Sequence, residues 1–261
     1  LVEKPLFTDP SDLSRMENFR KSYQAPVWVA MEYRYMPPMQ EFLKQADSFT
    51  GGIKMLTLME HRFPFLVKVG NWNRFNQKSG GTLVEKCCHH FDLMRHILKS
   101  DPVRVMASAG QMVNHLDEIY DGQKSDIWDA GFVIVDFANG TRALLELCMF
   151  AEGGRYEQEI VVTGEKGKIE TYIPGEELLI SNRVKNSFES LPIKNDSRVR
   201  EEGLHHGASY IEHLELIDCL IQGKSAKVDC QNGLESMILG LAAQESIKTG
   251  EPIYLGEFLR N

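Results

Sequence analysis

The stretch of sequence from Gly80 to Leu98 reads GGTLVEKCCHHFDLMRHIL. After the two glycines, apolar residues recur at intervals of three and four, at Leu83, Cys87, Phe91, Met94 and Leu98. This spacing is typical of an amphipathic helix that turns one face toward a core. It predicts a helix over residues 81–98, around which the rest of the fold is organised.

A second stripe on this predicted helix is ionisable and consists of Glu85, His89, Asp92 and His96. Residues four apart on a helix lie side by side, so the Glu85 carboxylate and the His89 imidazole are expected within pairing reach. Spacing alone favours a solvated face, but a carboxylate beside an imidazole is also what a proton-handling site requires. Both interpretations stay open. Asp92 and His96 are expected to pair at the surface or at a domain interface.

The run from Cys87 to His90 contains four possible metal ligands. Neighbouring helical residues point in directions about 100° apart. Structural zinc sites also need ligands spaced by roughly two to four residues and a second ligand pair elsewhere. The sequence offers no such second pair. We therefore expect no metal site.

The composition is that of an ordinary globular chain. Its 261 residues, 43% hydrophobic and 25% charged, allow one large domain or two small ones. The formal charge of −8 disfavours nucleic acid and anionic membranes as partners. Five cysteines without paired spacing favour reduced thiols, and no apolar run approaches the ~20 residues that cross a bilayer. These features predict a soluble, cytoplasmic protein.

The first residues predict part of a parallel α/β layer. Leu1-Val2 is interpreted as a strand end, residues 27–33 as a buried strand, and residues 11–24 as a helix between them, which together make a βαβ unit. A further helix is expected over residues 38–46. The buried face of the first helix is expected to carry Leu13, Met16, Phe19 and Tyr23.

The remaining residues predict a sheet backed by helices. Residues 182–203 are polar and are expected to form a mobile loop. Alternating strands and hairpin turns at residues 138–140 and 164–167 indicate an antiparallel meander. The predicted fold class is α+β, with a C-terminal, predominantly antiparallel sheet backed by helices and preceded by the remnant of a Rossmann-type α/β domain. Strands are expected over 53–61, 103–113, 130–137, 141–150, 157–163, 168–172 and 178–181, and helices over 208–222 and 232–248.

Four motifs, in their order and spacing, resemble those of the Gfo/Idh/MocA family of nicotinamide-dependent sugar and polyol dehydrogenases. The resemblance spans essentially the whole chain, with two departures: the family's aspartate falls on Glu85, one methylene longer, and the glycine-rich phosphate turn is absent. The four motifs are Glu3-Lys4-Pro5, Glu32-Tyr33-Arg34-Tyr35 followed by Pro37-Pro38, Trp72-Asn73-Arg74 leading to Gly80–His89, and Ala242-Ala243-Gln244-Glu245-Ser246 before Thr249-Gly250.

This resemblance implies that the chain is N-terminally truncated. Residues 1–35 are expected to be the end of the dinucleotide-binding Rossmann domain, and residues 36–261 an α/β domain for substrate binding and oligomerisation. The family's glycine-rich phosphate turn, G-x-G-x-x-G, does not occur in the sequence. Since that turn anchors the pyrophosphate, the chain alone is expected to bind NAD or NADP poorly and to be inactive by itself.

The resemblance also implies roles for single residues. Lys4, His89 and Glu85 are the expected catalytic residues: His89 as the base, Lys4 as a donor to the substrate oxygen, and Glu85 orienting the substrate or His89. Glu3, Lys4 and Arg34 are expected on the cofactor side. The expected substrate-binding residues are Trp72, Arg74, His205 and His206. Each also has a plain interpretation, as a loop lysine, a buried structural histidine, a core tryptophan or a surface loop.

The predicted function is hydride transfer between NAD(P) and a secondary alcohol of a sugar, cyclic polyol or derivative. Two alternatives stay open: an NAD-dependent enzyme that cleaves glycosides by transient oxidation, and a non-catalytic dimerising fragment. A sheet with one face left to cover predicts a homo-oligomer, either a dimer or a tetramer. The sequence does not choose between NAD and NADP, and it does not identify the substrate.

Overall fold

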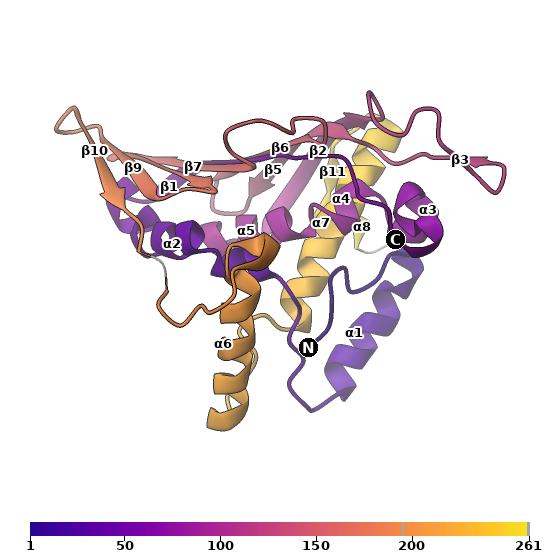
Figure 1. The fold of residues 1–261 in the computed structure, drawn as a ribbon, viewed down its shortest axis with the longest axis horizontal. Helices are drawn as coiled ribbons and strands as arrows, with labels where there is room; N and C mark the ends of the chain where they lie inside the picture. The colour runs from indigo at the N-terminus through magenta and orange to yellow at the C-terminus, as the bar shows by residue number, and fades with distance from the viewer. Residues whose placement is uncertain (195, 260–261) are drawn as a thin grey trace.

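Nine strands form one large sheet, and helices cover one of its faces (Figure 1). The computed structural model describes residues 1–194 and 196–259. Its strands are β1 (Ile53–His61), β2 (Pro102–Gly110), β3 (Ile119–Tyr120), β4 (Gln123–Lys124), β5 (Ala130–Phe137), β6 (Arg142–Cys148), β7 (Gln158–Gly164), β8 (Gly167–Ile173), β9 (Glu177–Asn182), β10 (Ser187–Pro192) and β11 (Ile253–Tyr254). Its α-helices are α1 (Leu13–Ser22), α2 (Pro37–Thr50), α3 (Asn76–Ser79), α4 (Thr82–Glu85), α5 (Cys88–Leu98), α6 (Ala208–Gln222), α7 (Cys230–Thr249) and α8 (Leu255–Phe258), and its 3-10 helices are η1 (Pro10–Asp12), η2 (Glu32–Tyr35), η3 (Val69–Arg74) and η4 (Gly203–His205).

The large sheet confirms the predicted α+β class, with one difference in its topology. Its strand order is β10-β9-β8-β7-β1-β6-β5-β2-β11. Every neighbouring pair is antiparallel except β1 and β6, which run parallel in the middle of the sheet. The prediction of a simple meander was therefore wrong at its centre. Local alternation identifies a strand, but it does not predict that β1 pairs with β6, about 90 residues later, because tertiary packing decides that pairing.

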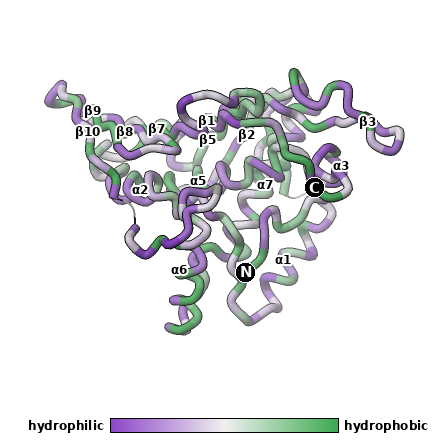
Figure 2. Tube along the Cα trace, viewed as in Figure 1, coloured by the Kyte–Doolittle hydropathy of each residue, from purple (hydrophilic) through white to green (hydrophobic). Residues whose placement is uncertain are grey.

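Helices α2, α5 and α7 pack beneath the sheet and define the core (Figure 1). Strand β5 illustrates the alternation, since Val133 and Val135 are fully buried while Phe132 and Ile134 on the opposite face are exposed. Figure 2 shows the apolar segments concentrated where helices and sheet meet. One face of the sheet is thus buried in the core, and the other carries no helix among the residues that the structure describes.

The predicted helix over residues 81–98 is two helices rather than one. Its apolar stripe is buried as expected, but α4 ends at Glu85 and α5 begins at Cys88. The Thr82 carbonyl accepts hydrogen bonds from both Lys86 and Cys87, which interrupts the regular ladder between the two helices. At this interruption Lys86 turns its ammonium toward Glu60 on β1, at 2.8 Å. A buried charge pair thus accompanies the break in a helix that periodicity predicts as continuous.

The N-terminal segment keeps only a trace of the predicted parallel layer. Val2 and Val29 form one isolated parallel bridge, with hydrogen bonds of 2.8 and 2.9 Å on its two sides. The predicted strand 27–33 was otherwise wrong, because the chain turns into the 3-10 helix η2 at Glu32. Helix α1 also lies nearer to solvent than expected: Phe19 and Tyr23 are exposed, and none of its residues is fully buried.

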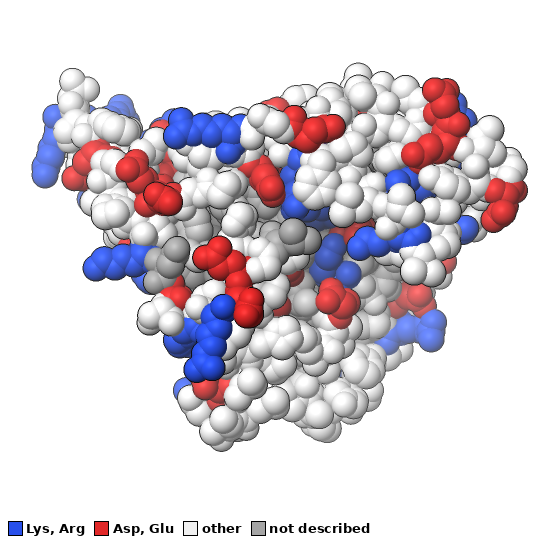
Figure 3. Space-filling view, in the orientation of Figure 1, with Lys and Arg blue, Asp and Glu red and all other residues white. Residues whose placement is uncertain are grey.

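Within residues 182–203, which were expected to form a mobile loop, residues 187–192 form a strand. Strand β10 extends the sheet at its edge by pairing antiparallel with β9. Its side chains are almost all exposed, so it shows no hydrophobic alternation from which a strand could be predicted. On the face of the molecule shown in Figure 3, acidic and basic side chains are interspersed. Among the described residues, no helix is long and apolar enough to span a bilayer.

Helix α7 lies against α4 at a close backbone approach. A Cβ placed on Gly240 of α7 would stand 2.7 Å from the Leu83 carbonyl oxygen of α4. Because that neighbour is backbone, it cannot swing aside as a flexible side chain would. The glycine therefore sets the distance between the two helices, and with it the position of Glu85 at the end of α4.

We expect Gly240→Ala to destabilise the protein by about 1–3 kcal/mol, the usual range for overpacking, even though alanine is the better helix former. Chemical denaturation would measure this free energy. Gly256→Ala in α8 is the matched control, since a Cβ there meets nothing within 4 Å. Equal stability changes in the two variants would contradict this role of the glycine.

Candidate active site

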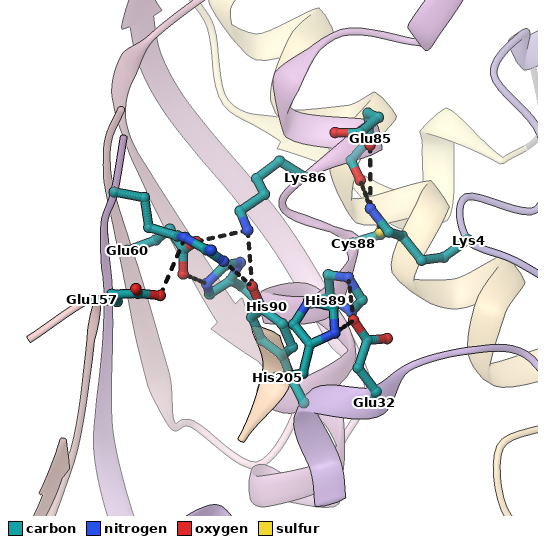
Figure 4. A network of polar contacts seen from close by, with 12 residues as sticks. Lys4, Glu32, Glu60, Glu85, Lys86, Cys88, His89, His90, Glu157 and His205 are labelled. Carbon is teal, nitrogen blue, oxygen red and sulfur yellow. Dashed lines mark hydrogen bonds and ion pairs between the residues drawn. The ribbon is translucent and has the colours of Figure 1, made fainter. Parts of the chain in front are cut away.

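Buried ionisable side chains gather where the N-terminal segment, η2 and the α4–α5 break meet (Figure 4). The N-terminal segment provides Lys4, and the break provides Glu85 and His89. Figure 4 shows the Lys4 ammonium beside Glu85 and Cys88, and the His89 ring beside Glu32. Sequence spacing alone could not establish the contact between Lys4 and Glu85, because they are 81 residues apart in the chain.

Lys4 is held by Glu85 rather than by solvent. Its ammonium donates to the Glu85 backbone carbonyl at 2.8 Å and to the Glu85 carboxylate at 3.3 Å. Burial by itself would lower the pKa of Lys4, but its neighbours Cys88 and Glu85 outweigh that effect and raise the pKa. Burial raises the pKa of Cys88 to about 12, so this thiol is neutral near pH 7. Glu85 is therefore the anion that keeps Lys4 charged.

His89 is almost completely buried and is stacked on Tyr33, with ring centroids 4.2 Å apart and planes inclined by 9°. Its Nε2 lies 3.6 Å from Glu32 Oε1, and the same oxygen lies 3.5 Å from Nδ1 of His205. Burial, followed by the charges of Lys4 and Lys86, holds the pKa of His89 well below its usual value. His89 is thus a neutral imidazole, the form that can accept a proton.

A second layer of charges lies behind the His89–Tyr33 stack. Glu60 is completely buried and pairs with Lys86 at 2.8 Å and with His90 at 3.1 Å. Burial would raise the pKa of Glu60, but the Lys86 ammonium and His90 together lower it to about 2. Lys86 also donates to the Tyr33 hydroxyl at 2.8 Å. These contacts hold the Tyr33 ring in place, and so also fix the ring of His89 that is stacked on it.

Four buried polar atoms of this cluster have no hydrogen-bond partner within the described residues, namely His89 Nδ1, His90 Nδ1, Glu85 Oε2 and Glu60 Oε1. Buried polar groups are normally hydrogen-bonded, so these atoms set the cluster apart from an ordinary packed core. In the same part of the chain, residues 1–194 and 196–259, no group of three or more His, Cys, Asp and Glu side chains is arranged to hold a metal.

Glu85 and His89 do not pair as their spacing suggests, because α4 ends at Glu85 and the carboxylate turns to Lys4. Of the two positions expected for Asp92, the surface was wrong, and its partner Arg34 lies within residues 1–35. Its carboxylate is buried and accepts two hydrogen bonds from Arg34, whose Nε lies 2.6 Å from Oδ2. His96 is half-buried, and burial is the main cause that lowers its pKa to about 4.

The other predicted residues lie at varying distances from this cluster. His205 joins it through Glu32, and His206 follows in a left-handed backbone conformation with φ 52°. Arg74 is buried elsewhere, where its Nε donates to Glu118 at 2.9 Å. Trp72 is half-buried in η3. Among the described residues, no hydrogen bond or ion pair links Arg74 or Trp72 to Lys4 or His89, so their substrate roles stay predictions.

Several members of the cluster were not predicted from the sequence, namely Glu32, Tyr33, Glu60, Arg62 and Lys86. Their signal is weak because they come from three separate segments, residues 32–33, 60–62 and 86, and the one pair at strand spacing is Glu60 with Arg62, at 3.8 Å. One clue was available: Glu60 is an acidic residue on a strand whose neighbours Leu58 and Leu56 face the core. A charge on the buried face of a strand needs a partner, and here Lys86 is that partner.

A large, mostly antiparallel sheet with helices on one face defines the class of this protein as an α/β domain. The profile of the Gfo/Idh/MocA oxidoreductase family, C-terminal alpha/beta domain, matches residues 50–255. The chain belongs to this oxidoreductase family.

Relatives with curated or solved records agree with that assignment. The chain is 23% identical over 262 residues to myo-inositol 2-dehydrogenase of Thermotoga maritima, covering 98% of this chain and 72% of the relative. An oxidoreductase from Agrobacterium radiobacter, solved with NAD+, L-tartaric acid and magnesium, superimposes with a TM-score of 0.79 at 19% identity, covering 98% of this chain and 72% of that one. Levoglucosan dehydrogenase, solved with NADH and levoglucosan, gives 0.79 at 18% identity, with 97% and 72% coverage.

We expect Lys86→Met to lower the free energy of unfolding by about 3–5 kcal/mol, because it leaves the buried Glu60 carboxylate without its main counter-charge. Denaturant titration at neutral pH would measure the change. The double variant Lys86→Met/Glu60→Gln should be much less destabilised, since both charges are then removed. Lys44→Met is the control, because Lys44 is an exposed partner of Glu41 and such pairs contribute at most ~1 kcal/mol. A loss no larger than the control's would contradict this pairing.

Proposed function

We propose that this chain forms the alcohol-binding and proton-transferring side of an NAD(P)-dependent oxidoreductase acting on a secondary alcohol of a sugar or cyclic polyol. The observation that carries the proposal is that the Lys4 ammonium, held by Glu85, and the neutral imidazole of His89 belong to one cluster of buried ionisable groups. Family membership supports it, as do the names of the relatives, one a myo-inositol dehydrogenase and one bound to NADH and levoglucosan.

The residues present fit a hydroxylated substrate. A neutral imidazole such as that of His89 can accept a hydrogen bond from a hydroxyl group, and the Lys4 ammonium can donate one. Of the residues expected on the cofactor side, Lys4 lies in the site, Glu3 is exposed next to it, and Arg34 is bound to Asp92. Glu3 and Lys4 would therefore border the nicotinamide, while Arg34 would shape this region through its ion pair. The nicotinamide ring, when bound, supplies the hydride acceptor or donor.

In the oxidising direction, His89 takes the proton of the substrate hydroxyl. Its neutral state suits it to this task. Lys4 donates a hydrogen bond to the same oxygen and stabilises the negative charge that develops there. Glu85 keeps Lys4 protonated and aimed, because it holds the ammonium through both its carboxylate and its backbone carbonyl. In the reducing direction, His89 returns the proton.

We also propose, on the same division of roles, that residues 1–35 belong to the cofactor side and residues 36–261 to the substrate domain. The segment before the boundary contributes Lys4 and Glu32, and the segment after it contributes Glu85 and His89. The active site therefore lies on the boundary, where a hydride donor and an alcohol would have to meet.

Replacing either central residue should abolish most of the activity. We expect Lys4→Met and His89→Gln each to lower turnover by about 10²–10⁴-fold, the usual contribution of a positioned acid or base. The measurement is polyol-dependent reduction of NAD(P) by the protein as its gene encodes it, with myo-inositol as the first substrate tested. Lys44→Met, in an exposed pair on α2, is the matched control.

Near-normal turnover in either variant would remove that residue from the mechanism. Release of sugar from a glycoside without net NADH formation would instead favour the glycoside-cleaving alternative. If the wild-type protein binds no polyol in a calorimetric titration, the substrate class proposed here is wrong.

We further propose that the helix-free face of the sheet mediates homo-oligomerisation. This face exposes Met106, Phe132 and Ile134, and Met106 and Ile134 are paired across β2 and β5. A contiguous apolar surface on a sheet is typical of a protein–protein interface.

Phe132→Glu should therefore shift the protein from an oligomer toward monomers, because it places a charge in the middle of this apolar face. Light scattering coupled to size-exclusion chromatography would measure the mass. Val184→Glu is the control, since Val184 is exposed in the turn between β9 and β10. An unchanged mass in Phe132→Glu, or an equal change in the control, would contradict this interface.

A further inference from the structure

An ion pair between η2 and α5 lies next to the stacked rings of Tyr33 and His89. Arg34 of η2 donates two hydrogen bonds to Asp92 of α5, one from Nε to Oδ2 at 2.6 Å and one from Nη2 to Oδ1. The Arg34 side chain is 8% exposed and that of Asp92 is 2% exposed. Because the guanidinium is planar and both bonds leave it along one edge, the pair fixes an orientation as well as a distance.

The ion pair and the ring stack join the same two elements. Arg34 directly follows Tyr33 in η2, and Asp92 follows His89 by three residues in α5. Residues three apart on a helix are neighbours on one face. The Tyr33 and His89 rings have their centroids 4.2 Å apart and their planes inclined by 9°. A shift of η2 along α5 that separated the rings would therefore also have to break the ion pair.

The position of η2 is set by such outside contacts, because the element is weak by itself. It has only four residues, and short 3-10 helices have poor hydrogen-bond geometry. The backbone hydrogen bonds from Arg34 to Met31 and from Met36 to Tyr33 are long, at 3.3 and 3.4 Å. Within the described part of the chain, no side chain caps η2 by a hydrogen bond. The side-chain contacts of η2 with other elements therefore decide where it lies.

Arg34 connects η2 to more than one neighbour. Its backbone carbonyl accepts a hydrogen bond from Gln40 of α2, and its Nη1 donates to the Lys227 carbonyl at 3.4 Å, in the segment before α7. Asp92 occupies the fork formed by Nε and Nη2. The guanidinium thus binds other parts of the protein.

The Tyr33 side chain is held at both of its ends. Lys86 donates a hydrogen bond to the Tyr33 hydroxyl at 2.8 Å. A ring held only at its hydroxyl could still tilt about that point. The pair of Arg34 with Asp92 holds the other end, which is the backbone from which the ring projects. The two ends together determine the plane of the ring that lies against His89.

We propose that Arg34 is a positioning residue of the active site, which keeps the Tyr33 ring flat against His89 through its paired hydrogen bonds to Asp92. This inference rests on the proposed function for its catalytic meaning, but the stacking itself can be observed without cofactor or turnover.

The direct test is NMR of the His89 ring in protein labelled with 13C-histidine, with His89 assigned from the signal lost in His89→Gln. A ring stacked on an aromatic face is shielded, so the His89 ring protons of the wild type should resonate upfield, and Tyr33→Leu should move them downfield. Arg34→Lys keeps the charge but gives up the planar fork, since an ammonium is a point charge. We expect it to move the His89 signals in the same direction as Tyr33→Leu does.

Arg104→Lys is the matched control. Arg104 holds Asp136 with Nε at 2.7 Å and Nη2 at 2.6 Å from one carboxylate oxygen, and this pair joins β2 to β5. Unchanged His89 signals in Arg34→Lys, or an equal change in Arg104→Lys, would overturn the proposal. If Arg34→Lys does not fold, Asp92→Asn is the second variant, because its amide leaves a single acceptor oxygen for the guanidinium. The same downfield change is expected there, and wild-type signals would overturn the proposal.

Turnover separates positioning from a purely structural role. We expect Arg34→Lys to lower kcat by about 10–10²-fold with a small change in KM, since a small misplacement of a catalytic group costs up to this much. A change confined to KM would contradict positioning, as would a normal kcat once His89→Gln has proved inactive. If the NMR changes are as expected while His89→Gln retains turnover, the proposed function fails and the role of Arg34 in holding the ring stack stands.

Discussion

The ion pair between Lys4 and Glu85 joins the first residues of the chain to the helix break at its centre. The lysine donates to two oxygens of one residue, so its direction is fixed as well as its position. Because Glu85 is paired with Lys4, it does not pair with His89. The carboxylate that lies against His89 is that of Glu32, with Oε1 3.6 Å from Nε2. The arrangement of the proposed active site follows from the pairing of Glu85 with Lys4.

Behind this pair lie several buried ionisable residues that are not among the expected substrate-binding residues. Glu60 is buried and pairs with both Lys86 and His90, and Lys86 also donates a hydrogen bond to the hydroxyl of Tyr33. Removing one member of such a network is costly, because the rest stays buried and unpaired. The gain is rigidity: Tyr33 is held at one end by Lys86 and presents its ring to His89 at the other. Stability and the orientation of the imidazole thus depend on the same contacts.

Local pattern predicted most of the fold. Strands β1 and β5 and helix α6 begin and end where periodicity places them, because each buries one regular face. The pattern failed where no apolar periodicity exists, as in β10, and where a side-chain contact overrides it, as at Lys86 between α4 and α5. The buried Lys86–Glu60 pair joins two segments 26 residues apart, and no local rule predicts such a partnership.

The sequence by itself determined the α+β class and the apolar face of the Leu83–Leu98 segment, because these depend on residue type and short-range spacing. The stripe that contains His89 also came from spacing, while Lys4 became a candidate only through the resemblance to the family. Only the tertiary structure decided which carboxylate lies against Lys4 and which lies against His89. The backbone interruption after α4 turns Glu85 toward Lys4, and Glu32 is then the carboxylate that lies against His89. Charge partners between distant segments are chosen by packing, which spacing along the chain does not encode.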